Sequence, residues 1–237
     1  TVQGLFEQAG IPLIGCGTLS SALCMDKARA HALARDAHIN VPGFITANIQ
    51  TSAQELSKRA AELEYPIYVK PVKAGSSFGI SRITSPEQLP QAAEKAFEFD
   101  NEITLEEEIP GREVGCAVLG AEKLILGRVD LIQSPGLFDY NEKYNPKESK
   151  IYMPAPIAPE LEERIQQTAA VLYRLLGCSG FARVDMFLTP QNQIVFNEIN
   201  TIPGLTAHSR FPNMMKGAGL ELKEVMRVLI ELSLKNE

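Results

Sequence analysis

The sequence predicts an α+β protein made of two units, each a small sheet covered by helices. Pairs of short strands, spaced like hairpins, are followed by helices, without the regular alternation of strand and helix that builds a parallel sheet. At 237 residues the chain is long enough for one large domain or two smaller ones with a hydrophobic core. We place the boundary between the two units near residues 106–110.

The composition narrows the class of protein. A formal charge of −6 argues against a general nucleic-acid binder, whose footprint is a basic patch. No apolar run approaches the roughly 18–20 residues of a membrane helix, so we expect no membrane partner. Cys16, Cys24, Cys116 and Cys178 lie far apart in no zinc-like spacing, and we expect buried free thiols in a cytosolic protein.

Helices in the first half are predicted by their start and stop signals. Gly10 ends the first helix, and the second is rich in Ala and Arg. Ser52 and Glu55 form a capping box, and Ser85 followed by Pro86 is an N-cap with proline in the first turn. The predicted helices cover residues 5–9, 26–37, 52–63 and 85–99.

Short apolar runs bounded by turn residues predict strands. They cover residues 11–14, 66–70, 78–83, 104–109, 113–118 and 124–131. Residues 133–156 show no periodicity, and a loop of this length is usually functional or disordered. Helical periodicity follows over residues 160–176 and stops at Gly177, a good C-cap residue. A final helix begins near Leu222.

The stretch RVDMFLTPQNQIVFNEIN, residues 183–200, predicts a β-hairpin with polar residues on an otherwise apolar ribbon. Two apolar runs flank a four-residue turn at residues 190–193. Alternation along each strand then sets the register. The predicted pairs are Thr189 with Ile194, Phe187 with Phe196, Asp185 with Glu198, and Arg183 with Asn200.

Asp185 and Glu198 would therefore be cross-strand neighbours, about 4.5–5.5 Å apart at Cβ. Two like charges at that spacing are destabilising unless a cation lies between them. Carboxylate and amide oxygens suit Mg²⁺, a hard cation. The hairpin therefore predicts a magnesium site that includes Asn200.

The segment KPVKAGSSFG, residues 70–79, predicts a phosphate-binding loop. Its glycines and its serines, Ser76 and Ser77, can expose successive backbone N–H groups, and Lys70 adds a positive charge. The order of Lys and Gly excludes a Walker A motif. The alternative is a simple hairpin turn. Lys27 is a second candidate cation, and its alternative is a solvated lysine in the first turn of a helix.

The acidic run at residues 106–108, followed by Ile109, ends a predicted strand at the unit boundary. Such a run is usually a solvated edge. An extended segment at a boundary can also offer backbone groups to an adenine, and a nearby carboxylate such as Glu113 can accept hydrogen bonds from ribose hydroxyls. Both interpretations stay open on these residues alone.

Several long motifs together resemble the ATP-grasp superfamily, and specifically the D-alanine–D-alanine ligase family. They occur in the family's order and cover nearly the whole chain: SALCMDK, YVKPVKAGSSFGI, EEEIPGREV, FDYNEKY, GFARVDMFL and NEINTIPGLTAHSRFP. The resemblance implies an ATP-grasp fold, in which two α+β subdomains hold ATP between them. It also implies a remnant of an N-terminal substrate domain at residues 1–15, a central subdomain at 16–106 and a C-terminal subdomain at 107–237.

The resemblance implies roles for residues on the ATP side. Lys27 and Lys70 match the lysines that hold the phosphates, and Ser76 and Ser77 lie in the loop that closes over them. The segment against which adenine sits is matched by Glu106, Glu108 and Ile109, and the ribose-binding acid by Glu113.

It also implies roles on the reaction side. Asp185, Glu198 and Asn200 match the ligands of two Mg²⁺ ions, with Mn²⁺ as a possible substitute. Arg183 and the backbone N–H of Gly204 match the groups that stabilise the tetrahedral oxyanion. Ser209 matches the residue that binds the carboxylate of the second substrate.

The long segment 133–156 resembles the family's ω-loop, a lid that seals the site. Within it, Lys143 and Tyr144 match the pair found in dipeptide-forming ligases, with Lys143 on the cofactor side and Tyr144 bonded to Ser76 or its neighbour. Ligases that use D-lactate resemble one another in carrying His near this position. We therefore expect an amine acceptor.

Arg210 stands where ordinary D-alanine ligases generally carry an apolar residue. Its donors would favour a polar acceptor side chain, and the SRFP pattern resembles variant ligases of vancomycin-resistance operons. The expected reaction is the ATP-dependent joining of D-alanine to D-serine through an acyl phosphate, for peptidoglycan precursors. The alternative is that Arg210 pairs with a carboxylate and that the acceptor is D-alanine.

Two further alternatives remain at this point: a module that binds ATP without turnover, and a phosphotransferase acting on a hydroxyl. The first residues suggest that an N-terminal portion is missing, so the chain is expected to bind ATP better than it turns over. Members of the family are commonly dimeric, and we expect a homodimer.

Overall fold

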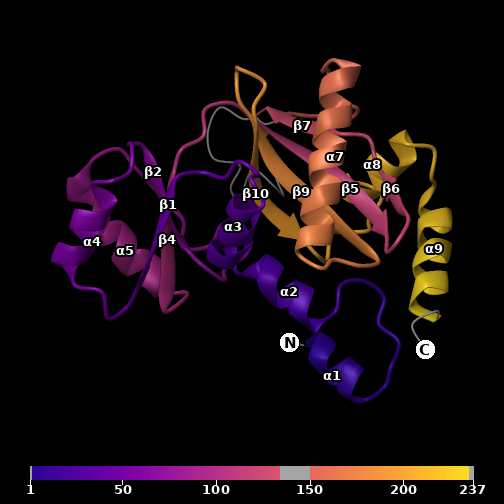
Figure 1. Cartoon of the computed structure of the whole chain (residues 1–237), viewed down its shortest axis with the longest axis horizontal. Coiled ribbons are helices and arrows are strands. Elements are labelled where there is room, and N and C mark those ends of the chain that lie inside the picture. Colours follow the sequence, from indigo (N-terminus) through magenta and orange to yellow (C-terminus); the bar gives the residue numbers. More distant parts are fainter. Residues whose placement is uncertain (1, 134–149, 235–237) are drawn as a thin grey trace.

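The computed structural model describes residues 2–133 and 150–234, and this part of the chain contains two sheets (Figure 1). The first sheet ends with β4 (Glu102–Glu107) and the second begins with β5 (Arg112–Gly120). The connection between the two sheets therefore runs from residue 108 to residue 111. The α+β class is confirmed, since helices pack on both antiparallel sheets.

The first sheet is antiparallel, in the order β1-β4-β2-β3. Besides β4, its strands are β1 (Phe44–Asn48), β2 (Ile67–Pro71) and β3 (Ser81–Ile83). Helices α4 (Ala53–Ala60) and α5 (Leu89–Phe97) pack on it, with the short 3₁₀ helix η1 (Pro86–Gln88) leading into α5. The Ser52 side chain caps α4 by accepting from the Glu55 N–H, as the sequence predicted.

The second sheet has the order β10-β9-β5-β7-β8, and β6 pairs with the other end of β5. Its remaining strands are β6 (Leu124–Leu126), β7 (Asp130–Gln133), β8 (Lys150–Tyr152), β9 (Phe181–Leu188) and β10 (Ile194–Asn200). Helices cover both faces: α2 (Thr18–Met25), α3 (Lys27–Asp36) and α7 (Pro159–Leu175) on one, and α8 (Arg210–Gly217) and α9 (Leu222–Leu234) on the other.

Strand alternation divides β9 into an apolar and a polar side. Val184 and Met186 belong to the core under α7, together with Cys116 of β5. Arg183 and Asp185 point to the opposite face, which α8 shares. Because successive side chains of a strand point to opposite faces, the same alternation builds the core and presents the site.

A β-bulge shifts the register of the hairpin between Phe196 and Glu198. The predicted pairs Asp185–Glu198 and Arg183–Asn200 are confirmed, whereas the pairs Thr189–Ile194 and Phe187–Phe196 are wrong: Ile194 pairs with Leu188, and Phe196 with Met186. The turn is one residue longer than predicted. The extra residue in β10, Asn197, restores the predicted register at the site.

Other sequence predictions need correction. Residues 11–14 form no strand, and the strand predicted at 78–83 is only three residues long because the preceding segment forms turns. The run 124–131 is broken into β6 and β7, and the loop predicted at 133–156 contains β8. Helices α1 (Val2–Gln8), α3, α7 and α9 agree with prediction, but α2 and α8 were not anticipated.

Helices α2 and α3 pack against β10 of the second sheet, although the sequence placed them in the central subdomain. The proposed division at residues 15 and 106 thus remains a prediction. Figure 1 shows α3 between the two sheets. The four cysteines are buried and free, as predicted. Within residues 2–133 and 150–234, no helix is long and apolar enough to cross a membrane.

Candidate functional site

A cavity of about 670 Å³ lies where the two sheets approach each other. Both sheets line it, through β2 and β4 on one side and β5 and β10 on the other. It brings together most of the residues predicted for the ATP side, and one predicted metal ligand: Lys27, Lys70, Ser76, Ser77, Glu106, Glu108, Ile109, Glu113 and Glu198. Residues separated by more than 150 positions therefore share one cavity.

The Gly/Ser loop has an unusual backbone. Ser76 and Ser77 both lie in the left-handed region, with φ of 52° and 61°. Residues other than glycine seldom adopt this conformation, and two in succession at a cavity wall are a reason to suspect function. Gly79, with φ of 71°, is required because a Cβ there would collide with Phe99 and Pro71. The segment forms turns, so the simple turn remains an alternative, and phosphate binding by this loop stays a prediction.

Lys27 is buried at the start of α3, so the alternative of a solvated lysine is wrong. Its Nζ donates to the backbone carbonyl of Ala74 at 2.9 Å, within the segment that leads into the Gly/Ser loop. The same Nζ lies 3.9 Å from Glu198 Oε2. Lys27 thus joins the loop of the first sheet to the hairpin of the second.

Lys70 forms the closest ion pair of the cavity wall. Its Nζ donates to Glu106 Oε2 at 2.6 Å, and Glu106 is almost completely buried. Burial alone would raise the pKa of Glu106, but the neighbouring Lys70, with His31 and Lys27, holds that pKa below its usual value. Glu106 is therefore ionised and is part of a buried charge pair, not of a solvated edge.

Glu108 also has partners. It accepts two hydrogen bonds from the Arg82 guanidinium, at 2.7 and 2.8 Å, and one from the Tyr68 hydroxyl at 3.0 Å. Hydrogen bonding from Arg82 is the main reason that the pKa of Glu108 lies below its usual value. Burial and the bond to Glu108 raise the pKa of Tyr68 to about 12, so the phenol remains a donor.

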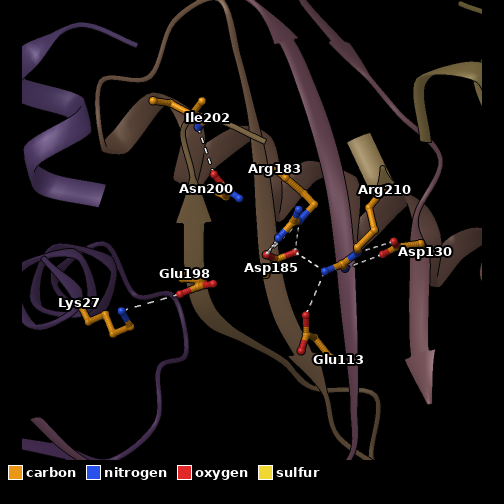
Figure 2. Close-up of polar contacts among 9 residues, drawn as sticks. All are labelled: Lys27, Glu113, Asp130, Arg183, Asp185, Glu198, Asn200, Ile202 and Arg210. Carbon is orange, nitrogen blue, oxygen red and sulfur yellow. Dashed lines mark hydrogen bonds and ion pairs between the residues drawn. The ribbon is translucent and has the colours of Figure 1, made fainter. Parts of the chain in front are cut away.

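Beside the cavity, Arg210 lies among three carboxylates and a second arginine (Figure 2). We call this group the arginine cluster, and its members are Arg183, Arg210, Asp130, Asp185 and Glu113. Arg210 donates to both oxygens of Asp130, at 2.7 and 2.8 Å, and to Glu113 at 3.1 Å. Its Nη1 lies 3.3 Å from Asp185. Arg183 donates to both Asp185 oxygens, at 2.7–3.0 Å.

The backbone makes room for this cluster at Gly115 of β5. A Cβ there would clash with the Arg210 guanidinium and lie 2.9 Å from oxygens of Asp130 and Asp185. Burial opposes the charge of Arg210, yet the Asp185 and Asp130 carboxylates raise its pKa well above the usual value. Arg210 therefore remains a charged guanidinium although it is buried.

Arg210 was predicted to offer its donors to a polar acceptor, with carboxylate pairing as the alternative. The contacts found are those of the alternative, since the guanidinium is bonded to Asp130 and Glu113. Any effect of Arg210 on acceptor choice would therefore have to act through these carboxylates.

The predicted metal ligands fit a hard cation in the chemistry of their donors, because Asp185, Glu198 and Asn200 all offer oxygen. The three side chains make different contacts. Glu198 lines the cavity, and the Asn200 side-chain oxygen accepts from the Ile202 N–H at 3.1 Å (Figure 2). Both Asp185 oxygens accept from Arg183 instead.

Among the described residues, no group of three or more His, Cys, Asp or Glu side chains is arranged to hold a metal ion. The electrostatic argument from the sequence, that a cation must separate Asp185 from Glu198, is already met by Arg183 and Lys27. A role for Asp185 in metal binding stays a prediction.

The predicted acceptor residues lie at the start of α8. Ser209 is its N-cap residue, and its Oγ accepts from the Thr206 N–H at 3.2 Å. Gly204 lies against it, because a Cβ on Gly204 would be 2.7 Å from Ser209 Oγ. Six predicted residues are not among those that line the cavity: Arg183, Asp185, Asn200, Gly204, Ser209 and Arg210. Lys143 and Tyr144 lie outside the described residues.

Sequence reasoning missed several charged or polar residues of the site. Asp130 follows a break between two strands and carries no motif, so its pairing with Arg210 had no signal. Tyr68 and Arg82 pair across β2 and β3, and a correct register for these short strands would have placed them together. His31 had no signal beyond its place in an Ala-rich helix.

Comparison with known proteins identifies the relatives of this chain. A family model described as D-ala D-ala ligase C-terminus matches residues 33–231. The chain is 43% identical over 99% of its length to the vancomycin/teicoplanin A-type resistance protein VanA of Enterococcus faecium, and covers 69% of it. It is 44% identical over 98% of its length to a putative D-alanine–D-lactate ligase of Streptomyces coelicolor, and covers 67% of that protein.

The crystal structure of the VanG D-Ala:D-Ser ligase from Enterococcus faecalis matches with a TM-score of 0.92 and 57% identity. The match covers 98% of this chain and 68% of that one. The chain thus spans about two thirds of the length of these relatives.

Proposed function

The chain belongs to the D-alanine–D-alanine ligase family, whose members are ATP-dependent ligases, and we propose that it joins D-alanine to D-serine. A carboxylate is a poor electrophile, so the γ-phosphoryl group of ATP is first transferred to the carboxyl group of D-alanine. ADP leaves, and the acyl phosphate is then attacked by the amine of the second D-amino acid. Phosphate departs, a proton is lost from nitrogen, and a dipeptide remains.

On the ATP side, we assign the phosphates to Lys27, Lys70 and the backbone of Ser76 and Ser77. Their positive charge and N–H groups offset the charge that spreads over the transferring phosphoryl group. Glu113 lines the same cavity, where we assign it to the ribose. When bound, Mg²⁺ would supply further charge neutralisation, and Glu198 and Asn200, together with Asp185, are the residues that we assign to it.

On the acceptor side, Arg183 and the N–H of Gly204 are assigned to the oxyanion formed when the amine attacks. Ser209, which lies against Gly204, is assigned to the carboxylate of the second substrate. Water would hydrolyse the acyl phosphate, so the reacting atoms have to be enclosed.

The observation that carries D-serine as the acceptor is the likeness to the VanG ligase. A site that hydrogen-bonds a substrate hydroxyl discriminates strongly against the analogue without it, because its polar groups are then left unpaired. We further propose that the product enters peptidoglycan precursors and lowers sensitivity to vancomycin. The second candidate acceptor is D-alanine. It is favoured by the hydrogen bonds of Arg210 to Asp130 and Glu113, because these bonds already occupy donors that a polar acceptor side chain would need.

The test is a competition between acceptors. The purified protein is given ATP, Mg²⁺ and D-alanine with equal concentrations of D-serine, and in separate reactions with D-lactate. The proposal requires release of ADP and phosphate that depends on both substrates, and more D-alanyl-D-serine than D-alanyl-D-alanine. Excess D-alanyl-D-alanine would identify an ordinary ligase, and an ester with D-lactate would refute the amine acceptor.

A further inference from the structure

His31 lies between the two sheets and belongs to neither. It sits on α3 with its side chain 1% exposed. Its ring makes edge-to-face contacts with Phe44 of β1, at 5.5 Å, and with Phe196 of β10, at 5.4 Å between ring centroids. One imidazole therefore packs against a strand from each side of the cavity.

The Nε2 atom of His31 is bonded to the β-bulge of the hairpin. It lies 2.7 Å from the carbonyl oxygen of Asn197, the residue that the register shift leaves unpaired in the ladder. A carbonyl oxygen only accepts, so Nε2 carries the hydrogen. The bond satisfies the carbonyl of the residue directly before Glu198.

The Nδ1 atom of His31 faces Glu106. Nδ1 and Glu106 Oε1 are 4.0 Å apart, and neither has a hydrogen-bond partner among the described residues. Burial is the main cause that lowers the pKa of His31; Glu106 opposes this shift, while Lys70 and Lys27 add to it. The imidazole is therefore neutral, and a lone pair on Nδ1 points at a carboxylate oxygen.

Two buried acceptors at this distance need a shared donor. They are too far apart for a direct hydrogen bond. A water about 2.8 Å from each atom would span 4.0 Å at an angle near 90° and would donate to both. Two polar partners are the fewest that a buried water requires, and without such a donor both atoms would be unsatisfied.

We propose that His31 is a positioning residue for the nucleotide site, through Asn197 on one sheet and through a bound water and Glu106 on the other. The second oxygen of Glu106 holds Lys70, and Asn197 precedes Glu198, so His31 sets two charged residues of the cavity at once. The inference rests on the proposed function only in assigning the cavity to ATP.

Three variants of His31 separate its contributions. His31→Gln keeps a donor near the Nε2 position, and His31→Asn keeps an acceptor near the Nδ1 position. His31→Phe removes both and retains a ring between Phe44 and Phe196. Phe44→Leu is the matched control, because it weakens the packing and leaves both hydrogen bonds intact.

The first measurement is the affinity for ADP with Mg²⁺, by calorimetry. His31→Phe should weaken ADP binding roughly tenfold, because the buried hydrogen bonds of the imidazole are lost. The affinities of His31→Gln and His31→Asn should lie between those of His31→Phe and the wild type. Phe44→Leu should stay within about twofold. In turnover, KM for ATP should rise while KM for D-alanine is unchanged. Equal ADP affinity in all four variants, or an equal rise in both KM values, overturns the proposal.

The second measurement needs no nucleotide. At and above pH 6.5, nitrogen-15 NMR of the free protein should show His31 mainly as the neutral tautomer protonated at Nε2. A high-resolution crystal structure should show the bridging water. An imidazolium, or a direct contact of Nδ1 with Glu106, overturns it. If the wild type fails to bind ADP, the proposed function falls, while the NMR result still decides the geometry of His31.

Discussion

The arginine cluster and the lysine end of the cavity (Lys27, Lys70, Glu106 and His31) both bury carboxylates beside cations, but they differ in what they leave unsatisfied. In the cluster, Arg210 uses its planar fork on both oxygens of Asp130. At the lysine end, one oxygen of Glu106 has no partner among the described residues.

The difference follows from the chemistry of the two cations. Guanidinium is planar, keeps its proton and binds carboxylates in a fixed geometry. The ammonium of lysine is a point charge on a flexible stem and can exchange partners. We therefore interpret the cluster as a rigid support for the second sheet and α8, and the lysine end as the part that changes contacts when a phosphate binds.

The largest effect should come from Arg210→Leu. This change leaves Asp130 and Asp185 buried without their shared cation, and breaking a buried pair from one side costs about 3–5 kcal/mol. Urea unfolding should show a loss of that size in the free energy of unfolding. The same change cannot be used alone to test acceptor choice, because the site would lose its support.

The double variant Arg210→Leu with Asp130→Leu is the matched control for that prediction. Removing both partners avoids the unpaired carboxylate of Asp130, so much of the lost stability should return. If the double variant is as unstable as the sum of its parts, then the pairing is not what Arg210 contributes.

A smaller effect is expected for Lys70→Met: the free energy of nucleotide binding should become less favourable by about 2–3 kcal/mol. The variant removes a charge that we assign to a phosphate, and charge-assisted hydrogen bonds contribute about this much. ADP should bind roughly 30- to 100-fold more weakly by calorimetry. Lys216→Met, which breaks an exposed pair with Glu221, is the control and should bind ADP normally.

The sequence predicted the chemistry of the site better than its contacts. Motif residues such as Lys27, Ser76 and Glu113 do line one cavity, because side-chain types and strand alternation are local properties. In the hairpin, the predicted register was wrong at Phe196 and right at Glu198. A β-bulge lies between these residues, and its extra residue is not visible in the sequence periodicity.

Long-range ion pairs could not be predicted in this way. Asp130 and Arg210 are 80 positions apart, and their pairing depends on how α8 lies over β5. The helices α2 and α8 were missed because their segments are short and rich in turn residues. The packing of α3 against the second sheet likewise depends on tertiary contacts that no local pattern encodes.

The two regions should also differ in their response to pH. The pKa of His31 in the folded protein lies below its ordinary 6.5 because of burial, with Glu106, Lys70 and Lys27 facing the ring. Below about pH 6.5 the unfolded chain takes up a proton that the folded chain does not. The free energy of unfolding should therefore decrease as the pH is lowered, by about 1.4 kcal/mol per pH unit, until the pH reaches the pKa of His31 in the folded protein.

Urea unfolding of wild type and His31→Phe between pH 7.5 and 5.5 measures this slope. The variant lacks the titrating group, so the difference between the two curves should shrink as pH falls. The same comparison with Phe44→Leu should show a constant difference from wild type, because that variant keeps the imidazole of His31. Parallel curves for wild type and His31→Phe would mean that the pKa of His31 is the same in the folded and the unfolded protein, which contradicts the lowering by burial.

The smallest effect is expected where the two regions meet, at the pair of Lys27 and Glu198. Their charged atoms are 3.9 Å apart and the Glu198 side chain is 33% exposed, so solvent screens the interaction. Exposed pairs of this kind contribute about 0–1 kcal/mol, and Glu198→Gln should change the free energy of unfolding by no more than that. Because Glu198 is assigned to Mg²⁺, the same variant should need much more Mg²⁺ to bind ADP. Glu102→Gln, at a more exposed pair, is the control. A loss of several kcal/mol in the free energy of unfolding would show instead that this pair holds the two sheets together. The lysine end would then support the structure as the arginine cluster does, and our distinction between the two regions would be wrong.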